Sequence, residues 1–383
     1  MAAATTVELL DRLIAFPTVS AESNLDLIDW IRTYLGEHGV PSRLTFSDDR
    51  RKANLFASIG EGTNGLVLSG HTDVVPVAGQ NWSGDPFRAA HRDGRIYGRG
   101  ACDMKGFIAA ALGLAPEWSR QSRRSPIHLA FSYDEEVGCL GAGRLLADIA
   151  DRGIRPRGCI VGEPTEMRVT IGHKGAGMYA FSVIGRAAHS SLAPTGVNAI
   201  DYATRIVRRF AEIADWLREN EQRCDAYDVP YSTIQVNRMN GGTAGNIVAD
   251  RCDFTIDIRH LPTTDRATIL AEIDGYLDAE LLPEMRRVAP EASVSWRMVG
   301  DVPGFGIAAD APLVRDVARS NSVEGSCGHV AFGSEAGLFQ RAGIPTVLCG
   351  PGSIEQAHKP DEFVTLDQLE RCERMLRDIS AQG

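Results

Sequence analysis

Residues 66–76 read LVLSGHTDVVP, and this stretch decides the fold of the chain. Its apolar run closes at Gly70 and is followed at once by His71 and Asp73. A continuous apolar run closed by glycine predicts a strand buried on both faces, as in a parallel sheet. Binding sites of open α/β sheets lie outside the carboxyl ends of the strands. The imidazole of His71 and the carboxylate of Asp73 are therefore well placed for chemistry.

Other short apolar stretches end in acidic residues in the same way. Residues 127–132 run into Glu135 and Glu136, and residues 159–161 run into Glu163. Helical patterns of apolar residues lie between these predicted strands. This alternation predicts an α/β domain with three layers and a mostly parallel sheet.

The pattern changes in the middle of the chain. Residues 252–259 alternate strictly between apolar and polar, which is typical of a half-buried antiparallel strand, and an amphipathic helix precedes them. We expect a separate α+β module over residues 177–298, with one sheet and helices on one face. It would be inserted into a catalytic domain formed by residues 1–176 and 299–383. Two domains also suit a length of 383 residues, which is more than one core usually covers.

Composition excludes several classes of protein. The net charge of −10 argues against a general surface for nucleic acid or acidic membranes. Eight cysteines, none in a C-x-x-C pair, indicate reduced thiols in a reducing compartment. The N-terminus lacks the basic region of a signal peptide, and the longest uncharged apolar stretch, residues 107–116, is too short to span a bilayer. We therefore expect a cytoplasmic protein.

Five loops at predicted strand ends carry the side chains of chemical interest: His71 with Asp73, Asp103, Glu135 with Glu136, Glu163, and His358. A single histidine after a strand is usually structural, and a pair of glutamates is usually solvated surface. Together they indicate more, because several buried carboxylates at one sheet edge need cations. Lysine or arginine could supply the charge. A pair of divalent metals explains the mixture of imidazole and carboxylate better, and this mixture suits Zn²⁺, Co²⁺ or Mn²⁺.

Other chemistries have weaker support. The chain contains no G-x-S-x-G, P-loop, H-E-x-x-H or G-x-G-x-x-G motif. Cys102 adjoins Asp103, but no histidine and asparagine setting favours a thiol protease over a packed small residue. We interpret the remaining histidines apart from His189 as structural or exposed: His38, His91, His128, His173, His260 and His329.

Seven motifs together resemble the di-zinc amidohydrolase and peptidase family. They are HTDVVP, GRGACDMKG, DEEVGCLGAG, VGEPT, GHKG, AAHSS and QAHKPDEF. That family includes acetylornithine deacetylase, succinyl-diaminopimelate desuccinylase, aminoacylase and glutamate carboxypeptidases. The resemblance extends from near the N-terminus to the last predicted helix, so it covers essentially the whole chain.

The resemblance implies a role for each residue of the metal site. Asp103 would bridge two metals, which would be Zn²⁺ with Co²⁺ as the alternative. His71 and Glu163 would complete one site, and Glu136 and His358 the other. Asp73 would orient His71 by accepting its second ring N–H. Glu135 would be the general base that takes a proton from a metal-bridging water and passes it to the leaving amine.

The resemblance also implies roles outside the metal site. His189 would hold the oxyanion, reaching the active site of a partner subunit in a homodimer formed through the inserted lid module. Its alternative is a residue that hydrogen-bonds locally. Arg259 and Asn246 would grip the α-carboxylate of the substrate, although a surface ion pair is the alternative for Arg259. Glu335 would neutralise a substrate ammonium, or else it simply favours the start of a helix.

The C-terminal motifs GSEAGLFQRAGIP and VLCGPGSIEQAHKPDEF most resemble the acetylornithine deacetylases. They imply hydrolysis of N2-acetyl-L-ornithine to L-ornithine and acetate, in arginine biosynthesis. The nearest alternative is the same chemistry on succinyl-diaminopimelate, another N-acyl amino acid or a dipeptide. Two further alternatives are a non-catalytic metal-binding dimer and a metal-free structural α/β protein.

Overall fold

The computed structural model describes residues 4–20, 22–123, 125–321 and 327–381, which form two compact units. The first unit comprises Met1–Gly172, Phe305–Val330 and Ser334–Gly383, and the second comprises His173–Gly304 and Ala331–Gly333. The boundaries between the units, at 172/173 and 304/305, lie a few residues from the expected ones at 176/177 and 298/299. The second boundary is later than expected because the last strand of the second unit continues to Val302.

The first unit is built on one large sheet, of which nine strands lie in the described part of the chain. Their order is β1 (Ser42–Phe46), β2 (Ala53–Ile59), β6 (Ile127–Ser132), β3 (Leu66–His71), β7 (Gly158–Val161), β15 (Thr346–Leu348), β8 (Thr170–His173) and β13 (Phe305–Gly306), with β14 (Gly328–Val330) beside β8. The central strands β6, β3, β7 and β15 are parallel, whereas β1, β2 and β8 pair antiparallel to their neighbours. The predicted mostly parallel sheet is confirmed at its centre.

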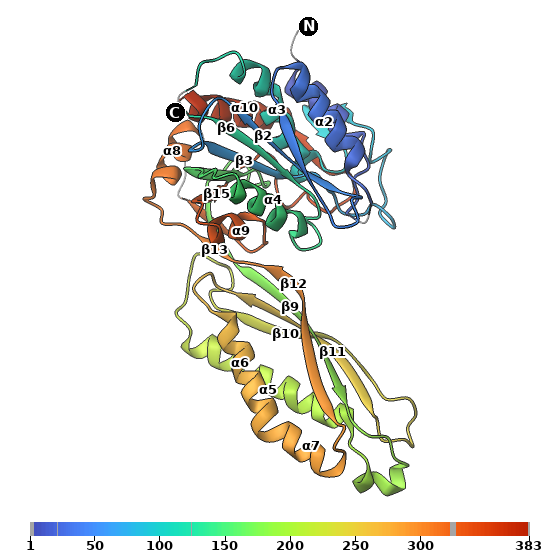
Figure 1. Ribbon diagram of the computed structural model, residues 1–383. Helices are drawn as coiled ribbons and strands as arrows, with labels where there is room; N and C mark the ends of the chain where they lie inside the picture. Colours follow the sequence, from blue (N-terminus) through green and yellow to red (C-terminus); the bar gives the residue numbers. More distant parts are fainter. Residues whose placement is uncertain (1–3, 21, 124, 322–326, 382–383) are drawn as a thin grey trace. The chain divides into compact units, whose positions relative to one another are not determined.

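Helices cover both faces of this sheet and make three layers (Figure 1). On one face α3 (Gly106–Trp118) packs against α1 (Thr6–Ile14), α2 (Leu25–Glu37) and α10 (Leu366–Ala381), and α8 (Pro312–Ser320) packs against α10. On the other face α4 (Leu140–Asp151) packs against α9 (Ala336–Arg341). The three-layer α/β fold expected for the catalytic domain is therefore present.

Local chemistry explains two of these helices. Thr5 and Glu8 form the predicted capping box of α1: the Glu8 N–H donates to the Thr5 hydroxyl, and the Thr5 N–H donates to the Glu8 carboxylate. Helix α3 is apolar on nearly every side because it is the buried centre of the helical layer. Among the helices of the described residues, none is both long and apolar enough to cross a bilayer.

A small second sheet joins segments that are distant in sequence. Its order is β16 (Phe363–Thr365), β5 (Arg95–Tyr97) and β4 (Ala90–Arg92), with Phe363 opposite Tyr97. Two short segments thereby bring the residues after β5 next to the loop that precedes β16. This pairing matters for the site, because Asp103 follows β5 and His358 precedes β16.

The second unit is an antiparallel sheet with helices on one face. The strand order is β10 (Thr233–Gly241), β11 (Arg251–His260), β9 (Gly175–Ile184) and β12 (Ser293–Val302). The helices are α5 (Ala199–Asn220), α6 (Arg266–Tyr276) and α7 (Leu282–Val288). The predicted alternation of β11 is present: Cys252, Phe254, Ile256 and Ile258 are buried in the core of this unit. The residues between them in sequence lie on the opposite, open face.

Buried His128 on β6 predicts a pH-dependent loss of stability. The ring is fully buried, lies 2.8 Å from the Ser58 hydroxyl oxygen and stacks on Phe56. Burial lowers the pKa of His128 to about 4, and a hydrogen bond with the backbone of Thr63 offsets only part of this effect. As the pH falls, this histidine takes up a proton near pH 6.5 in the unfolded chain but only near pH 4 in the folded protein. Its contribution to the free energy of unfolding is therefore complete above pH 6.5 and is lost as the pH falls toward 4.

We therefore expect the free energy of unfolding of the wild type to fall by about 3 kcal/mol more than that of the His128→Gln variant between pH 7 and pH 4. Urea unfolding at a series of pH values measures this difference. The exposed His91 provides the control variant, His91→Gln. Equal pH dependence of the wild type and the His128→Gln variant would contradict the assignment.

Candidate metal centre

The sheet brings the predicted metal ligands to one edge of the first unit. His71 is the last residue of β3, Glu135 and Glu136 follow β6, and Glu163 follows β7. The strands β6, β3 and β7 are parallel neighbours, so their carboxyl ends lie side by side. Asp103 lies in the turn Ala101–Lys105 just before α3, and its peptide bond to Met104 is cis.

Two groups of side chains could each hold a metal ion, and they share one carboxylate. His71, Asp103 and Glu163 form the first, and Asp103, Glu136 and His358 form the second. Within each group the ligand atoms all lie within 4.8 Å of one another. The structure thus brings all five residues predicted as ligands together in these two groups.

Asp103 turns one oxygen toward each histidine. Its Oδ1 lies 2.9 Å from Nε2 of His71, and its Oδ2 lies 3.3 Å from Nε2 of His358. The same nitrogen of His358 lies 3.0 Å from Oε2 of Glu136. One carboxylate that faces two imidazoles through its two oxygens has the geometry needed to bridge two ions.

The charge of the site fits divalent cations. Glu163 is only 4% exposed, and its buried Oε1 has no hydrogen-bond partner in the described part of the chain. Burial and the nearby Asp103 carboxylate raise the pKa of Glu163 well above its usual value. Burying an acceptor oxygen without a hydrogen-bond donor costs free energy unless a cation binds to that oxygen. Imidazole nitrogens with carboxylate oxygens are the donor set of Zn²⁺ and similar ions.

The histidines respond to the same excess of negative charge. Burial alone would lower the pKa of His71, but the neighbouring carboxylates, first Asp103, raise it well above its usual value. Hydrogen bonds to Asp103 and Glu136 raise the pKa of His358 to about 10. Protons on the two imidazoles and bound divalent ions are therefore alternative ways to neutralise the same acids.

Asp73 contacts His71 through a different atom from the one expected. His71 Nδ1 lies 2.9 Å from the main-chain oxygen of Asp73, whereas the Asp73 carboxylate oxygen Oδ1 is 3.6 Å away. That carboxylate instead accepts the N–H groups of Glu135 at 3.0 Å and Glu136 at 3.3 Å, and the hydroxyl of Ser20 at 2.7 Å. The carboxylate thus holds the main chain of Glu135 and Glu136.

Glu135 lies beside the two groups without belonging to either. Burial raises the pKa of Glu135 above its usual value, and the carboxylates of Glu136, Asp73 and Asp103 add to this effect against the opposing charge of His71. The Cys139 thiol donates to its Oε1 over 3.3 Å. A carboxylate with a raised pKa next to metal ligands is suited to accept and return a proton.

Glu335 is buried in the first unit, just before α9. It is 1% exposed, and its two oxygens accept the hydroxyls of Ser69 on β3 and Ser132 on β6. Burial raises its pKa, and these two hydroxyls partly oppose that change. A substrate ammonium that paired with Glu335 would have to share or displace these hydroxyls.

The other predicted residues belong to the second unit, and all three side chains are exposed. His189 Nδ1 lies 2.8 Å from the Ser191 hydroxyl and accepts the Ser191 N–H, as the local interpretation predicts. The main-chain oxygen of Asn246 accepts the Ser190 N–H, so the loops of His189 and Asn246 are adjacent. Arg259 forms an ion pair with Asp257 at 3.0 Å. With these local contacts, the ring of His189 and the guanidinium group of Arg259 remain at the surface.

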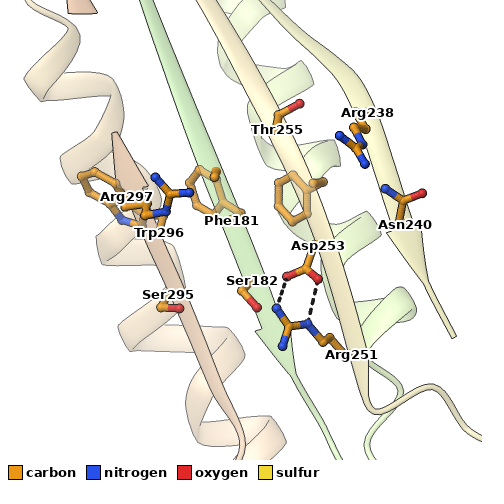
Figure 2. Close-up of a pocket in the computed structure, with 12 residues that line it drawn as sticks. Phe181, Ser182, Arg238, Asn240, Arg251, Asp253, Thr255, Ser295, Trp296 and Arg297 are labelled. Atoms are coloured by element: carbon orange, nitrogen blue, oxygen red, sulfur yellow. Dashed lines mark hydrogen bonds and ion pairs between the residues drawn. The ribbon is translucent and has the colours of Figure 1, made fainter. Parts of the chain in front are cut away.

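The open face of this sheet carries a polar hollow of about 580 Å³ (Figure 2). One row across the four strands contains Arg238, Thr255, Ala180 and Arg297, so small residues lie between two arginines. Arg251 is paired there with Asp253, as Figure 2 shows. Arg259 occurs on the same face of β11 by its alternation, and no predicted metal ligand lines the hollow.

Two residues that hold segments of the site in place were not predicted from the sequence. The Ser20 hydroxyl donates to the Asp73 carboxylate, and the Glu362 carboxylate accepts the N–H groups of Cys102 and Asp103. Hydrogen bonds to main-chain N–H groups require no particular spacing in sequence. The one available signal was that Glu362 lies inside the motif QAHKPDEF.

Comparison with known proteins agrees with this geometry. The profile of peptidase family M20/M25/M40 matches residues 67–382. An acetylornithine deacetylase of Pasteurella multocida is 32% identical over 98% of this chain and 97% of its own length. A second, of Proteus mirabilis, is 33% identical over 98% of this chain and 96% of its own length.

Solved structures show the same fold. An M20 family metallo-carboxypeptidase of Sulfolobus solfataricus superposes with a TM-score of 0.75 at 18% identity, covering 98% of both chains. A dinuclear metal-binding peptidase of the M20 family from Bacillus subtilis gives 0.66 at 15% identity, covering 98% of this chain and 97% of the other. The resemblance found in the motifs is confirmed: the chain belongs to peptidase family M20/M25/M40 and is a metal-dependent hydrolase.

Proposed function

We propose that this protein hydrolyses N2-acetyl-L-ornithine to L-ornithine and acetate. The observation that best supports amide hydrolysis is that the Asp103 carboxylate is shared between two ligand groups beside Glu135. The choice of acyl amino acid is supported by the curated relatives of that name, which align over almost their full length. We propose that the protein acts in the cytoplasm, in arginine biosynthesis.

In this proposal Asp103 would bridge two ions, His71 and Glu163 would hold one, and Glu136 and His358 would hold the other. Zn²⁺ is the proposed metal, with Co²⁺ as the alternative, because the donor set contains nitrogen and oxygen and no thiolate. When bound, the ions supply a water of lowered pKa and polarise the substrate carbonyl. The Asp73 carboxylate fixes the main chain of Glu135 and Glu136 by accepting their N–H groups.

Glu135 performs the proton transfers. Its carboxylate accepts the proton of the attacking water and then donates that proton to the nitrogen of the leaving amine, so one group is base first and acid second. A raised pKa suits both halves of this cycle. The Cys139 thiol limits the rotation of Glu135 by donating to Oε1.

Residues of the second unit complete the proposed site. Arg259 and Asn246 bind the α-carboxylate of the substrate, and His189 stabilises the oxyanion from a partner subunit. This assigns the second unit the roles of lid and homodimer contact. Glu335 selects for a substrate ammonium through the charge that it adds behind Ser69 and Ser132.

A substrate panel tests the proposal. We expect N2-acetyl-L-ornithine to give a kcat/KM at least about tenfold above acetyl-L-citrulline, acetylated neutral amino acids, succinyl-diaminopimelate and dipeptides, a difference of about 1.4 kcal/mol. Glu335→Gln should reduce that preference. Chelation should abolish all activity, and Zn²⁺ or Co²⁺ should restore it. Preference for another member of the panel would overturn the substrate, and activity after exhaustive chelation would overturn the mechanism.

A further inference from the structure

One buried carboxylate, that of Glu362, connects the loop of Asp103 to the loop of His358. Glu362 and its ion-pair partner Arg99 are each 1% exposed. We propose that Glu362 and Arg99 are positioning residues, which fix the main chain of both loops so that Asp103 and His358 face the same ion. The inference rests on the proposed ligand roles of those two residues, and it concerns groups that belong to neither ligand set.

Glu362 accepts three main-chain N–H groups on the Asp103 side. Its Oε1 accepts the N–H groups of Cys102 at 2.9 Å and Asp103 at 3.1 Å, and its Oε2 accepts the N–H of Gly100 at 3.0 Å. Hydrogen bonds from N–H groups to a carboxylate are about twice as strong as neutral ones. Because the Asp103 N–H is itself bound, the position of the bridging side chain depends directly on Glu362.

Arg99 extends the network to the His358 side. Its Nη1 donates to Oε2 of Glu362 at 2.7 Å and to the main-chain oxygen of Lys359 at 3.3 Å. Its Nη2 donates to Oε1 of Gln80 at 2.6 Å, and Nε2 of Gln80 donates to the main-chain oxygen of His358 at 2.8 Å. The planar fork of an arginine can make these contacts at once, whereas a lysine cannot.

The loop of His358 needs such support more than the other ligands do. His358 has a φ of +61°, a left-handed conformation that costs an ordinary residue roughly 1–2 kcal/mol. Its side chain is 52% exposed, so packing fixes it little. His71 and Glu163, in contrast, sit on or directly after strands of the central sheet. Loss of the network should therefore weaken the ion held by Asp103, Glu136 and His358 more than the other ion.

The isosteric variant Glu362→Gln separates positioning from mere stability. Glutamine keeps the volume and one acceptor oxygen, but it places an NH₂ group opposite the donors of Gly100 and Arg99. We expect the metal-depleted full-length variant, titrated with Zn²⁺ against a chelating dye, to bind the ion of Asp103, Glu136 and His358 about 10- to 100-fold more weakly and the other ion with a clearly smaller loss. Hydrogen exchange at the amides of Gly100, Cys102 and Asp103 should also be faster in the metal-depleted variant.

Two further variants keep the test decisive. Glu117→Gln removes a partly buried ion pair with Arg377, 3.0 Å long, that joins α3 to α10, and it should leave both affinities unchanged. Gln80→Ala removes the contact to the His358 main chain and leaves the Arg99–Glu362 pair in place, and it should repeat the selective loss. If Glu362→Gln does not fold, the Gln80→Ala result decides.

Unchanged binding of both ions, or equal weakening of both, in the folded variants would overturn the proposal. The Asp103→Asn variant, titrated in parallel, distinguishes this failure from failure of the ligand assignment. If Asp103→Asn binds two ions as the wild type does, the ligand roles are wrong and the positioning role is overturned with them. If Asp103→Asn loses both ions while Glu362→Gln and Gln80→Ala keep them, only the positioning role is overturned.

Discussion

Replacing Asp103 with asparagine is expected to lower the bound metal from two ions per chain to fewer than one and to reduce kcat/KM by roughly 10⁴-fold. The reason is that both proposed sites take an oxygen from this carboxylate, one facing His71 and the other facing His358. An amide keeps the shape but loses the charge and one acceptor, and several kcal/mol of transition-state stabilisation depend on the ions. Elemental analysis and initial rates on the same sample measure both effects.

Glu163→Gln is the matched control for Asp103→Asn. It changes a carboxylate of the first ligand group only, so one ion should remain bound through Asp103, Glu136 and His358. A variant Asp103→Asn that loses no more metal than Glu163→Gln would show that Asp103 is not shared.

The second large effect is expected at Glu135, where replacement by glutamine should lower kcat by 10²- to 10⁴-fold while two ions stay bound. Glu135 belongs to neither ligand group, so its loss removes proton transfer and leaves the ligands intact. KM should change little, because the substrate still meets the same charges. Steady-state kinetics together with metal analysis checks the three quantities.

Glu136→Gln provides the comparison for Glu135→Gln, because the two residues are adjacent and share the Asp73 carboxylate as acceptor of their N–H groups. It should lose metal as well as activity. If Glu135→Gln also loses metal, or if it keeps more than about a tenth of the wild-type kcat, Glu135 is not the general base.

The sequence predicted the central sheet because its strands are buried on both faces. A short apolar run closed by glycine, such as residues 66–70, is typical of a strand buried on both faces, and β3 is fully buried as expected. Strands near the sheet edge were not predicted with the same success. β13 has two residues and β14 has three, which is too short for a period to be recognised, whereas the short strand β15 was predicted from its buried apolar residues.

The second unit shows the same contrast. β11 was predicted from its strict alternation, and its bounds Arg251–His260 match the expected strand closely. β12 alternates poorly because much of it is exposed, and the expected boundary at residue 298 falls inside its bounds Ser293–Val302. The pairing of β16 with β5 joins residues more than two hundred positions apart, and no local pattern indicates such a contact.

The part of the candidate site that could be predicted consists of the side chains that directly follow the ends of strands. His71, Glu136 and Glu163 converge because β3, β6 and β7 are parallel neighbours. The partners of the Asp73 carboxylate could not be predicted, because an acceptor bound by main-chain N–H groups leaves no mark in the identity of its donors. Glu362 escaped prediction for the same reason.

The most direct measurement is anomalous diffraction at the zinc edge from crystals of the zinc-loaded protein. We expect two peaks, one next to His71 and Glu163 and the other next to Glu136 and His358, each within about 2.2 Å of a different oxygen of Asp103. A single peak, or two peaks of which only one contacts Asp103, would contradict this expectation.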